Sequence, residues 1–479
     1  MIQKKTWILT FILYTSIISN GWAQLQRSDD FHSKYTLQEV VVLSRHNIRS
    51  PLSGPESALG RITPHQWFEW SSATSELSLR GGVLETMMGQ YFRKWLVSEG
   101  LMAENELPAE GTIRFYANSM QRTIATAQYF SSGMLPVANI KIEHHFDVGT
   151  MDPVFTPKLT FINDNYKELA VKQIADLFGN GTTAGIGQKM ASNYGLLEQV
   201  LDISQSVSCQ QGDTCGFPTD DTVIKLELNK EPGMTGGLKL ACSASDALVL
   251  QYYEESDENK AAFGHNLTLA DWGKISAIKD WYGDVLFTAP MVSVNVAHPL
   301  LQEILSELNT DGRHFSFLCG HDSNIGSVLA ALGVTDYILP NAIESKTPIG
   351  SKLVIEKWEG PDGKQYAALN LCYQSVDQLR TMPLLSLQNP PVVYSLTLEG
   401  LKANADGLYL FSDLEARFSE RLAQYDKLAT GITNASVSAP KFSAAMYDMQ
   451  GRHIIAAPKK GIIIKEGRKV VVKHPMKRQ

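Results

Sequence analysis

The chain repeats one junction three times: an apolar segment suited to a buried strand ends, polar or charged residues follow, and a helical segment begins. The three apolar segments end at Leu43, Ala117 and Cys319. Strands that alternate with helices are typical of an α/β fold built on a parallel sheet. In such a sheet, ligands bind outside the carboxyl ends of the strands, where helix N-termini present free amides. The sequence therefore predicts an α/β domain with a binding crevice at these strand ends.

The three strand ends supply side chains whose chemistry suits a phosphoryl group. They are Arg45, His46 and Arg49 after the first strand, Arg122 after the second, and His321 and Asp322 after the third. Arginine matches phosphate oxygens with a fork of donors and stays charged. Nearby arginines disfavour a protonated imidazole, so we expect His46 to stay neutral and nucleophilic. With Asp322 as the proton donor for the departing alcohol, the set predicts a phosphatase that forms a covalent phosphohistidine.

Each of these features has an ordinary explanation when it is taken alone. An Arg-His pair usually lies at a surface or in a structural ion pair, and a His-Asp pair before a helix is often only a cap. Their joint placement at strand ends favours the phosphatase. A non-catalytic protein that binds phosphate esters is the alternative from another class, but such a protein needs neither the nucleophile His46 nor the acid Asp322.

The N-terminal segment has the pattern of a secretory signal peptide. Two lysines precede an apolar run over residues 6–19, and small residues follow at Gly21 and Ala23. The run is shorter than the ~20 residues that a membrane-spanning helix needs. The pattern predicts removal of residues 1–23 and export to the periplasm or the medium, with no stable membrane span.

The remainder divides by composition. Residues 24–433 carry the strand–helix junctions, and residues 157–285 within them change to mostly helical segments, which predicts an inserted helical cap. Residues 434–479 are expected to form a linker and a short β-rich module, with "EGRK" as a hairpin turn. The basic tail of this module has the solvated face of a strand as its ordinary interpretation, although such modules can also attach exported proteins to a surface.

The net charge and the cysteine spacing bear on nucleic-acid binding, on disulfides and on zinc sites. A net charge of −7 argues against nucleic-acid binding. Of the five cysteines, Cys209 and Cys215 are close enough to form a disulfide in an exported protein, and the other three are expected to be buried. No zinc spacing is present, and the pair His144 and His145 lacks the i, i+4 spacing of a helical zinc site. The oligomeric state stays open.

The motifs resemble those of the histidine acid phosphatases, branch 2 of the histidine phosphatase superfamily. "RHNIRSP" resembles the Arg-His-Gly-x-Arg-x-Pro signature of that family, and "GHDSNI" resembles its distal His-Asp motif. Further stretches, such as "RGGVLE", "ANSMQRTIATAQ" and "TPIGSKL", are similar to the bacterial periplasmic glucose-1-phosphatase and phytase group, over residues 37–425. The resemblance implies a phosphoglycerate-mutase-like α/β domain with a helical cap. It also implies His46 as nucleophile, Asp322 as acid, and as phosphate ligands Arg45, Arg49, Arg122 and His321. No metal or cofactor is expected from the resemblance.

One residue departs from the broad signature, because Asn47 stands where the family pattern has glycine. Glycine at such a place suggests a positive φ or close packing against the ligand. Asparagine is among the residues that tolerate the left-handed region. It also occurs here in the glucose-1-phosphatase branch, so Asn47 indicates a subgroup of the family.

Substrate choice is predicted from Glu231, in the stretch "KEPGMTGG" of the cap. The resemblance matches it to a glutamate near the pocket in the glucose-1-phosphatase branch. Our hypothesis is that its charge disfavours whole inositol hexakisphosphate and favours small sugar phosphates; an ordinary surface glutamate is the alternative. A phytase proper and a mutase of the related fold are the other candidate enzymes, and the signal peptide disfavours the mutase.

Overall fold

The computed structural model describes residues 25–54 and 56–430, together with four short strands further along the chain. The predicted signal peptide and the predicted boundary at 433/434 lie outside the described residues. The chain divides into two compact units, Met1–Ala429 and Thr430–Gln479. The predicted α/β domain and its predicted helical cap both belong to the first unit.

A seven-stranded sheet forms the centre of the first unit, in the order β2-β5-β1-β6-β7-β8, with β9 paired to β7. Strands β1, β2 and β5 are parallel, and β6 begins the antiparallel part. The bounds are β1 (Thr36–Arg45), β2 (Ile113–Ala117), β5 (Phe315–Gly320), β6 (Lys352–Glu359), β7 (Gln365–Tyr373), β8 (Val392–Ser395) and β9 (Tyr409–Leu410). The three strands that the sequence singled out are therefore neighbours.

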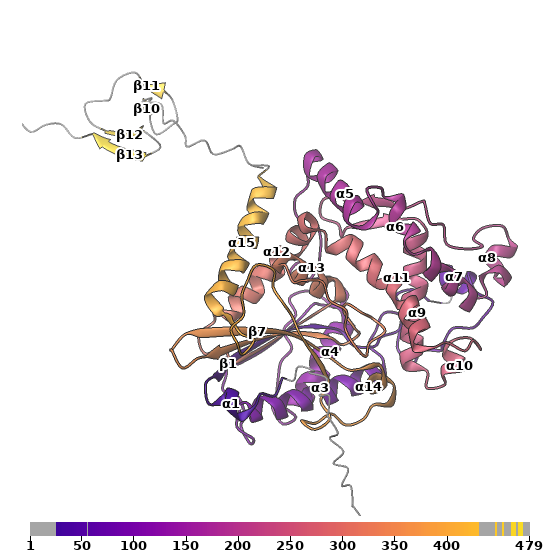
Figure 1. The fold of residues 1–479 in the computed structure, drawn as a ribbon, viewed down its shortest axis with the longest axis horizontal. Coiled ribbons are helices and arrows are strands. Elements are labelled where there is room, and N and C mark those ends of the chain that lie inside the picture. Colours follow the sequence, from indigo (N-terminus) through magenta and orange to yellow (C-terminus); the bar gives the residue numbers. More distant parts are fainter. Residues whose placement is uncertain are drawn as a thin grey trace, which may run out of the picture. The chain divides into compact units, whose positions relative to one another are not determined.

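Helices cover both faces of this sheet (Figure 1). One face packs on α3 (Leu79–Ser98) and α4 (Gln121–Met134), and the other on α12 (Pro290–Leu308), α13 (Asp322–Leu332) and α15 (Phe411–Ala429). Alternate residues of β1 serve the two cores: Val40 and Val42 join the first, Val41 and Leu43 the second. A strand buried on both faces needs an unbroken apolar run, which explains the sequence of β1.

Helices α3 and α4 approach each other closely because both carry glycine at the contact. A Cβ on Gly89 would lie 2.1 Å from the Phe130 carbonyl oxygen, and one on Gly133 would lie 2.0 Å from that of Thr86. Either substitution would push the helices apart, and with them the segments on which Asn47 and Arg122 are held. Short helices complete the body: α1 (Asp29–His32), α2 (Ala58–Arg61) and α14 (Val376–Thr381).

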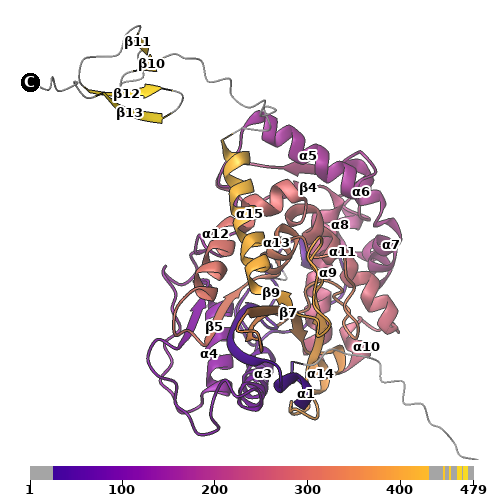
Figure 2. The same cartoon turned by 60° about the vertical axis from the view of Figure 1, so that its left-hand side comes forward.

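The region predicted as a helical cap is mainly helical, and its helices lie together beside the sheet (Figure 1). They are α5 (Asp164–Phe178), α6 (Ala184–Gln188), α7 (Ala191–Val200), the 3₁₀ turn η1 (Ile203–Gln205), α8 (Val207–Gln210), α9 (Gly237–Glu254), α10 (Glu258–Ala261) and α11 (Leu269–Phe287). Helices α7, α9 and α11 pack against one another (Figure 2). A small hairpin of β3 (Val223–Lys225) and β4 (Gly233–Thr235) interrupts them, which the sequence did not predict.

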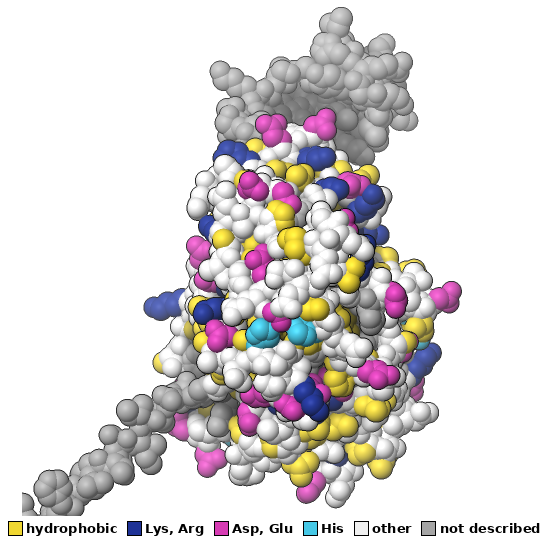
Figure 3. Space-filling model, turned by 90° about the vertical axis from the view of Figure 1, so that its right-hand side faces the viewer, with side chains coloured by type: hydrophobic (Ala, Val, Ile, Leu, Met, Phe, Trp, Pro, Cys, Tyr) yellow, Lys and Arg dark blue, Asp and Glu magenta, His cyan; other side chains and the backbone are white. Residues whose placement is uncertain are grey.

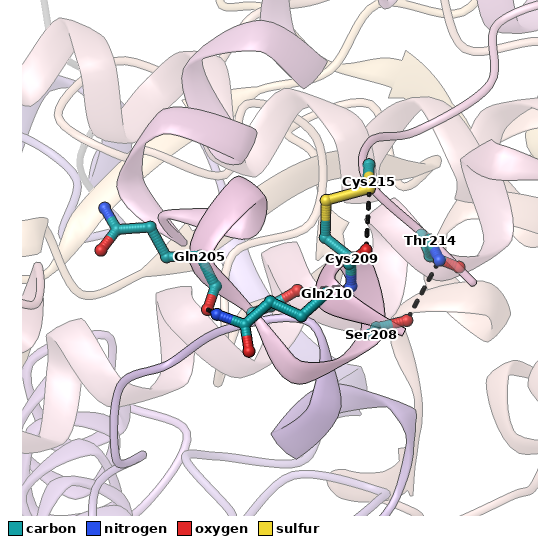
Figure 4. The surroundings of a disulfide bond; sticks show 7 residues. Gln205, Ser208, Cys209, Gln210, Thr214 and Cys215 are labelled. Atoms are coloured by element: carbon teal, nitrogen blue, oxygen red, sulfur yellow. Dashed lines mark hydrogen bonds between the residues drawn. A yellow bond between two sulfur atoms is a disulfide. The ribbon is translucent and has the colours of Figure 1, made fainter. Parts of the chain in front are cut away.

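The predicted disulfide joins Cys209 and Cys215, across a turn in which the backbone N–H of Thr214 donates to Ser208 Oγ at 3.2 Å (Figure 4). Cys319 and Cys372 are buried as predicted. Cys242 departs from the prediction, since it is half-buried and lines the main cavity. Cys242 lies on α9, and this helix forms part of the wall of the cavity described below.

The second unit contains a four-stranded antiparallel sheet in the order β11-β10-β12-β13. Its strands are β10 (Met446–Tyr447), β11 (His453–Ile454), β12 (Gly461–Lys465) and β13 (Arg468–Val472). Lys465 pairs with Arg468, which confirms the hairpin predicted at "EGRK".

Among the described residues, no single helix is long and apolar enough to cross a membrane. Helices α11 and α12 meet that criterion of length and composition only as a pair, across a bend of 85°.

Candidate active site

The carboxyl ends of β2, β5 and β1 meet at one edge of the sheet. The register pairs Arg45 with Gly320 and Ala117 with Cys319, so the three strands end at the same level. A cavity of about 880 Å³ opens there. Six of the seven predicted site residues line it: His46, Arg49, Arg122, Glu231, His321 and Asp322. Arg45 lies behind the wall and is only 1% exposed.

His46 is held in one tautomer by its own loop. Its Nδ1 lies 2.9 Å from the carbonyl oxygen of Asn47, and its backbone N–H donates to the Gly320 carbonyl at 3.1 Å. Because a carbonyl oxygen only accepts, Nδ1 must carry the hydrogen, which leaves the lone pair on Nε2. Burial, with the positive charges of Arg122 and Arg49, holds the pKa of His46 well below its usual value. The imidazole is therefore neutral in acid.

Asn47 has a different role from the one that its place in the motif suggests. It is not among the residues with positive φ, so the expectation of a left-handed backbone is wrong. Its amide Nδ2 instead donates to Glu85 Oε1 at 2.8 Å, and its Oδ1 accepts from the Ile48 N–H at 2.8 Å. Glu85 Oε1 also accepts from Lys352 Nζ at 3.0 Å. This buried polar network fixes the loop whose carbonyl orients His46.

Replacing Lys352 by methionine should cost about 3–5 kcal/mol of unfolding free energy, because it leaves the buried Glu85 carboxylate without its counter-charge. Urea denaturation measures the change. Lys364→Met is the matched control, since Lys364 pairs with Asp362 at the surface and should leave the stability nearly unchanged. Equal stabilities for the two variants would contradict a stabilising role of the buried pair.

Arg45 is locked into the wall by a carboxylate that no local motif marks. Its Nη1 donates to Glu344 Oε1 at 2.5 Å and to the Thr347 carbonyl at 2.6 Å, and its Nη2 lies 3.4 Å from Asp322 Oδ2. Burial alone would raise the pKa of Glu344, but Arg45 and Lys279 outweigh it and lower that pKa. The guanidinium of Arg45 is thus a fixed positive charge beneath the cavity.

The other two arginines differ in how they are paired. Arg49 Nη2 lies 3.0 Å from Asp246 Oδ2, which comes from cap helix α9. The side chain of Arg122 makes no hydrogen bond or ion pair with any other residue that the structure describes, and its buried Nε lacks a partner. Burial and the charge of Arg49 lower the pKa of Arg122 to about 10. An unpaired guanidinium in a cavity wall is suited to receive an anion.

His321 is also fixed as a neutral donor. Its Nε2 accepts from Asn118 Nδ2 at 2.7 Å, and the Asn118 amide cannot be reversed because its Oδ1 accepts from the Asp152 N–H at 2.8 Å. The hydrogen of His321 is therefore on Nδ1. Burial and the charge of Arg122 lower the pKa of His321 to about 3.

Asp322 begins α13 and is paired with two cations. Its Oδ2 lies 3.1 Å from Lys279 Nζ and 3.4 Å from Arg45 Nη2. Burial would raise the pKa of Asp322, but Lys279 and Arg45 outweigh it and hold that pKa well below its usual value. The carboxyl group is therefore ionised when the cavity contains no anion.

Glu231 stands in the turn between β3 and β4, where its side chain is exposed on the cavity wall. Its pKa is raised, because surrounding protein displaces water from the carboxylate and Asp322 adds a negative charge nearby. The residue that the sequence placed near the pocket thus lines the same cavity as His46.

Three contacting residues were missed by sequence reasoning: Lys279, Glu344 and Asp246. A signal for Lys279 was available, since it continues the buried stripe of Trp272, Ile275 and Ser276 along α11. A lysine at such a position is expensive to bury without a partner. For Glu344 and Asp246 no local pattern distinguishes them from other acidic residues.

Comparison with known proteins identifies the family of this chain. A model of the histidine phosphatase superfamily (branch 2) matches residues 36–370. The glucose-1-phosphatase of Salmonella typhimurium is 38% identical over 377 residues, or 78% of this chain and 89% of that protein. The glucose-1-phosphatase of Providencia rettgeri is 35% identical over 423 residues, covering 87% and 99%. The phytase of Citrobacter braakii superposes with a TM-score of 0.74 at 26% identity, covering 82% and 98%. The chain belongs to branch 2 of the histidine phosphatase superfamily and is a phosphatase.

Proposed function

We propose that this phosphatase hydrolyses small phosphomonoesters, sugar phosphates such as glucose 1-phosphate among them, by transfer through His46. The observation that carries the proposal is the fixed tautomer of His46, which leaves Nε2 nucleophilic beside Arg49, Arg122 and His321. The glucose-1-phosphatases at 38% and 35% identity support the choice of substrate class.

In the first step, Nε2 of His46 attacks phosphorus while the bond from phosphorus to the alcohol oxygen breaks. Arg49 and Arg122 neutralise the charge on the phosphoryl oxygens, and His321 donates from Nδ1. The guanidinium of Arg45, which is buried behind the cavity wall, adds a further positive charge near the phosphoryl group. Asp322 gives its proton to the departing oxygen, so that a neutral alcohol leaves.

In the second step, water attacks phosphorus and the bond to His46 Nε2 breaks. Asp322, now a carboxylate, takes the proton from that water, and inorganic phosphate is released. Each group has thereby returned to its starting state.

The proposal requires a protonated Asp322 at the moment of attack, although this carboxyl group is ionised in the free site. A bound phosphate ester resolves the conflict, because its negative charge repels the carboxylate and shares the cations Lys279 and Arg45 that stabilise it. Both effects raise the pKa of Asp322 in the substrate complex. Acid pH favours the same state.

Glu231 is proposed to set the preference for small substrates. Replacing it by threonine should raise the ratio of kcat/KM on inositol hexakisphosphate to that on glucose 1-phosphate by about tenfold, because one unfavourable charge interaction of ~1.4 kcal/mol is removed. Parallel steady-state assays of phosphate release measure the ratio.

The matched control is Glu227→Thr. Glu227 belongs to the same turn but pairs with Lys230 at the surface, away from the cavity wall. The control should keep the wild-type ratio. An unchanged ratio in Glu231→Thr, or an equal change in both variants, would sink the proposal for Glu231 while leaving the phosphatase activity unaffected.

A phytase acting mainly on inositol hexakisphosphate is the second candidate. The superposition on the Citrobacter braakii phytase and the cavity volume of about 880 Å³ favour it. The carboxylates Glu231 and Glu399 on the cavity wall oppose it, since a hexaphosphate would bring many negative charges near them. A substrate panel at acid pH decides: higher kcat/KM on inositol hexakisphosphate than on glucose 1-phosphate in the wild type would establish the phytase.

The proposal includes export of the protein to the periplasm or the medium. The lysine, apolar and small-residue pattern of residues 1–23 supports it, and so does the Cys209–Cys215 disulfide, because disulfides persist in oxidising compartments. Cell fractionation with N-terminal sequencing of the mature chain tests it. The β-rich second unit is proposed as a module that attaches the protein to a surface.

A further inference from the structure

Two histidines and an aspartate converge outside the catalytic cavity. His65 lies in the segment after β1, Asp202 lies between α7 and η1, and His265 follows α10. The two imidazoles face one carboxylate oxygen: His65 Nε2 is 2.8 Å and His265 Nε2 is 3.2 Å from Asp202 Oδ2. We propose that these three side chains bind a divalent transition-metal ion of the zinc type, which fastens the cap to the catalytic body.

The separations suit a single ion. Zinc bonds to nitrogen and oxygen of ~2.0–2.2 Å in a tetrahedron place ligand atoms about 3.3–3.5 Å apart. The potential ligand atoms of this cluster all lie within 4.8 Å of one another. The 3.2 Å separation of His265 Nε2 from Asp202 Oδ2 is close to the tetrahedral value, and the 2.8 Å separation of His65 Nε2 from the same oxygen is a hydrogen-bond distance that must lengthen when an ion binds. Small rotations of the imidazoles bring the set around one ion, with water at the remaining position. Imidazole nitrogen with carboxylate oxygen suits zinc better than calcium or magnesium.

The segments that carry the histidines are held together by an independent contact. The Gln251 side chain, which is 2% exposed, accepts from the Phe68 N–H at 2.8 Å and donates to the Ala261 carbonyl at 2.8 Å. One amide thus joins the chain just after His65 to the chain just before His265. The ligands are brought together by this scaffold and do not depend on their own hydrogen bonds for placement.

The orientation of each ligand is also constrained. The His65 ring stacks on Phe263, with centroids 4.9 Å apart and planes at 11°. Phe263 and Gly264 both have positive φ, and this tight turn directs His265 back towards His65. Asp202 has φ +47°, a conformation that aspartate tolerates better than most residues. The ligand side chains are therefore largely ordered before the ion binds, which lowers the entropic cost of binding.

The cluster remains open to solvent, so an ion can reach it. The side chains of His65, Asp202 and His265 are 28%, 29% and 27% exposed. Figure 3 shows a face of the protein on which two histidine side chains lie side by side next to an acidic one. His65 lines a second cavity and not the main one, which separates the proposed metal from the catalytic groups.

The test is a zinc titration of the full chain after removal of metals by a chelator. Isothermal titration calorimetry should find one equivalent of Zn²⁺ bound to the wild type. At free zinc about 100 times the dissociation constant, Tm should rise by about 3 °C. In His65→Ala/His265→Ala the affinity should fall at least tenfold, the order of loss known even for residues that only support metal ligands. The Tm rise should then be lost at the same zinc concentration.

Further variants separate ligation from general damage. Asp202→Asn keeps the size of the side chain and removes the charged ligand, so it should also weaken zinc binding. His144→Ala removes an exposed histidine elsewhere and should bind zinc like the wild type. Phosphatase activity without zinc verifies that each variant is folded. The proposal is overturned if the wild type binds no stoichiometric zinc, or if the double variant binds it as tightly as the wild type.

Discussion

Replacing His46 by alanine should lower kcat on glucose 1-phosphate by at least about 10⁴-fold, because it removes the nucleophilic Nε2 that is proposed to form the covalent phosphoryl intermediate. Arg49, Arg122 and His321 stay in place in this variant, so phosphate should still bind. Steady-state assays at acid pH measure the loss, and binding of inorganic phosphate measured by calorimetry verifies that the anion site persists. Trapping with labelled substrate should give an acid-labile phosphoprotein in the wild type only.

The control for this experiment is His144→Ala, which removes an exposed imidazole and should keep full activity. Turnover retained in His46→Ala would refute the covalent mechanism. A wild-type protein that binds phosphate esters but turns none over would instead establish the non-catalytic alternative, so the two failures can be distinguished.

Replacing Asp322 by asparagine should lower kcat by about 10²–10⁴-fold on sugar phosphates, because the leaving alkoxide then lacks a proton donor. The loss should be much smaller on p-nitrophenyl phosphate, whose leaving group departs without protonation. The ratio of the two losses is the informative quantity. It tests proton donation itself, because a change in phosphate affinity would affect both substrates alike.

Asp336→Asn is the matched control for that ratio. Asp336 also lines the cavity, but its carboxylate pairs with Lys346 and not with Arg45 or Lys279. In the control, kcat should change by the same small factor on both substrates. An equal loss on both substrates in Asp322→Asn would rule out Asp322 as the acid and leave the nucleophile untouched.

The strand ends could be predicted from the sequence because the signal is local. A continuous apolar run such as that of β1 indicates a strand buried on both faces, and the residues that follow it must emerge at the edge of the sheet. The same argument places Arg122 and His321, and it needs only that the three strands be neighbours.

What could not be predicted depends on contacts between distant segments. Glu344 and Asp246 acquire their roles only when the chain brings them to Arg45 and Arg49, and nothing in their own neighbourhoods indicates it. Asn47 shows how a correct local observation can have the wrong physical reason. Its side chain is there to join Glu85, 38 residues away, and the backbone at that position is ordinary.

The ion pair between Lys279 and Asp322 has a consequence for how such enzymes can be altered. Lys279 belongs to the cap helix α11, whereas Asp322 begins α13, directly after the sheet strand β5. The cap, which also carries Glu231, therefore supplies a charge that lowers the pKa of Asp322. Exchanging caps between relatives to obtain a new specificity would change the ionisation of Asp322 at the same time, unless the incoming cap carries a cation at the position of Lys279.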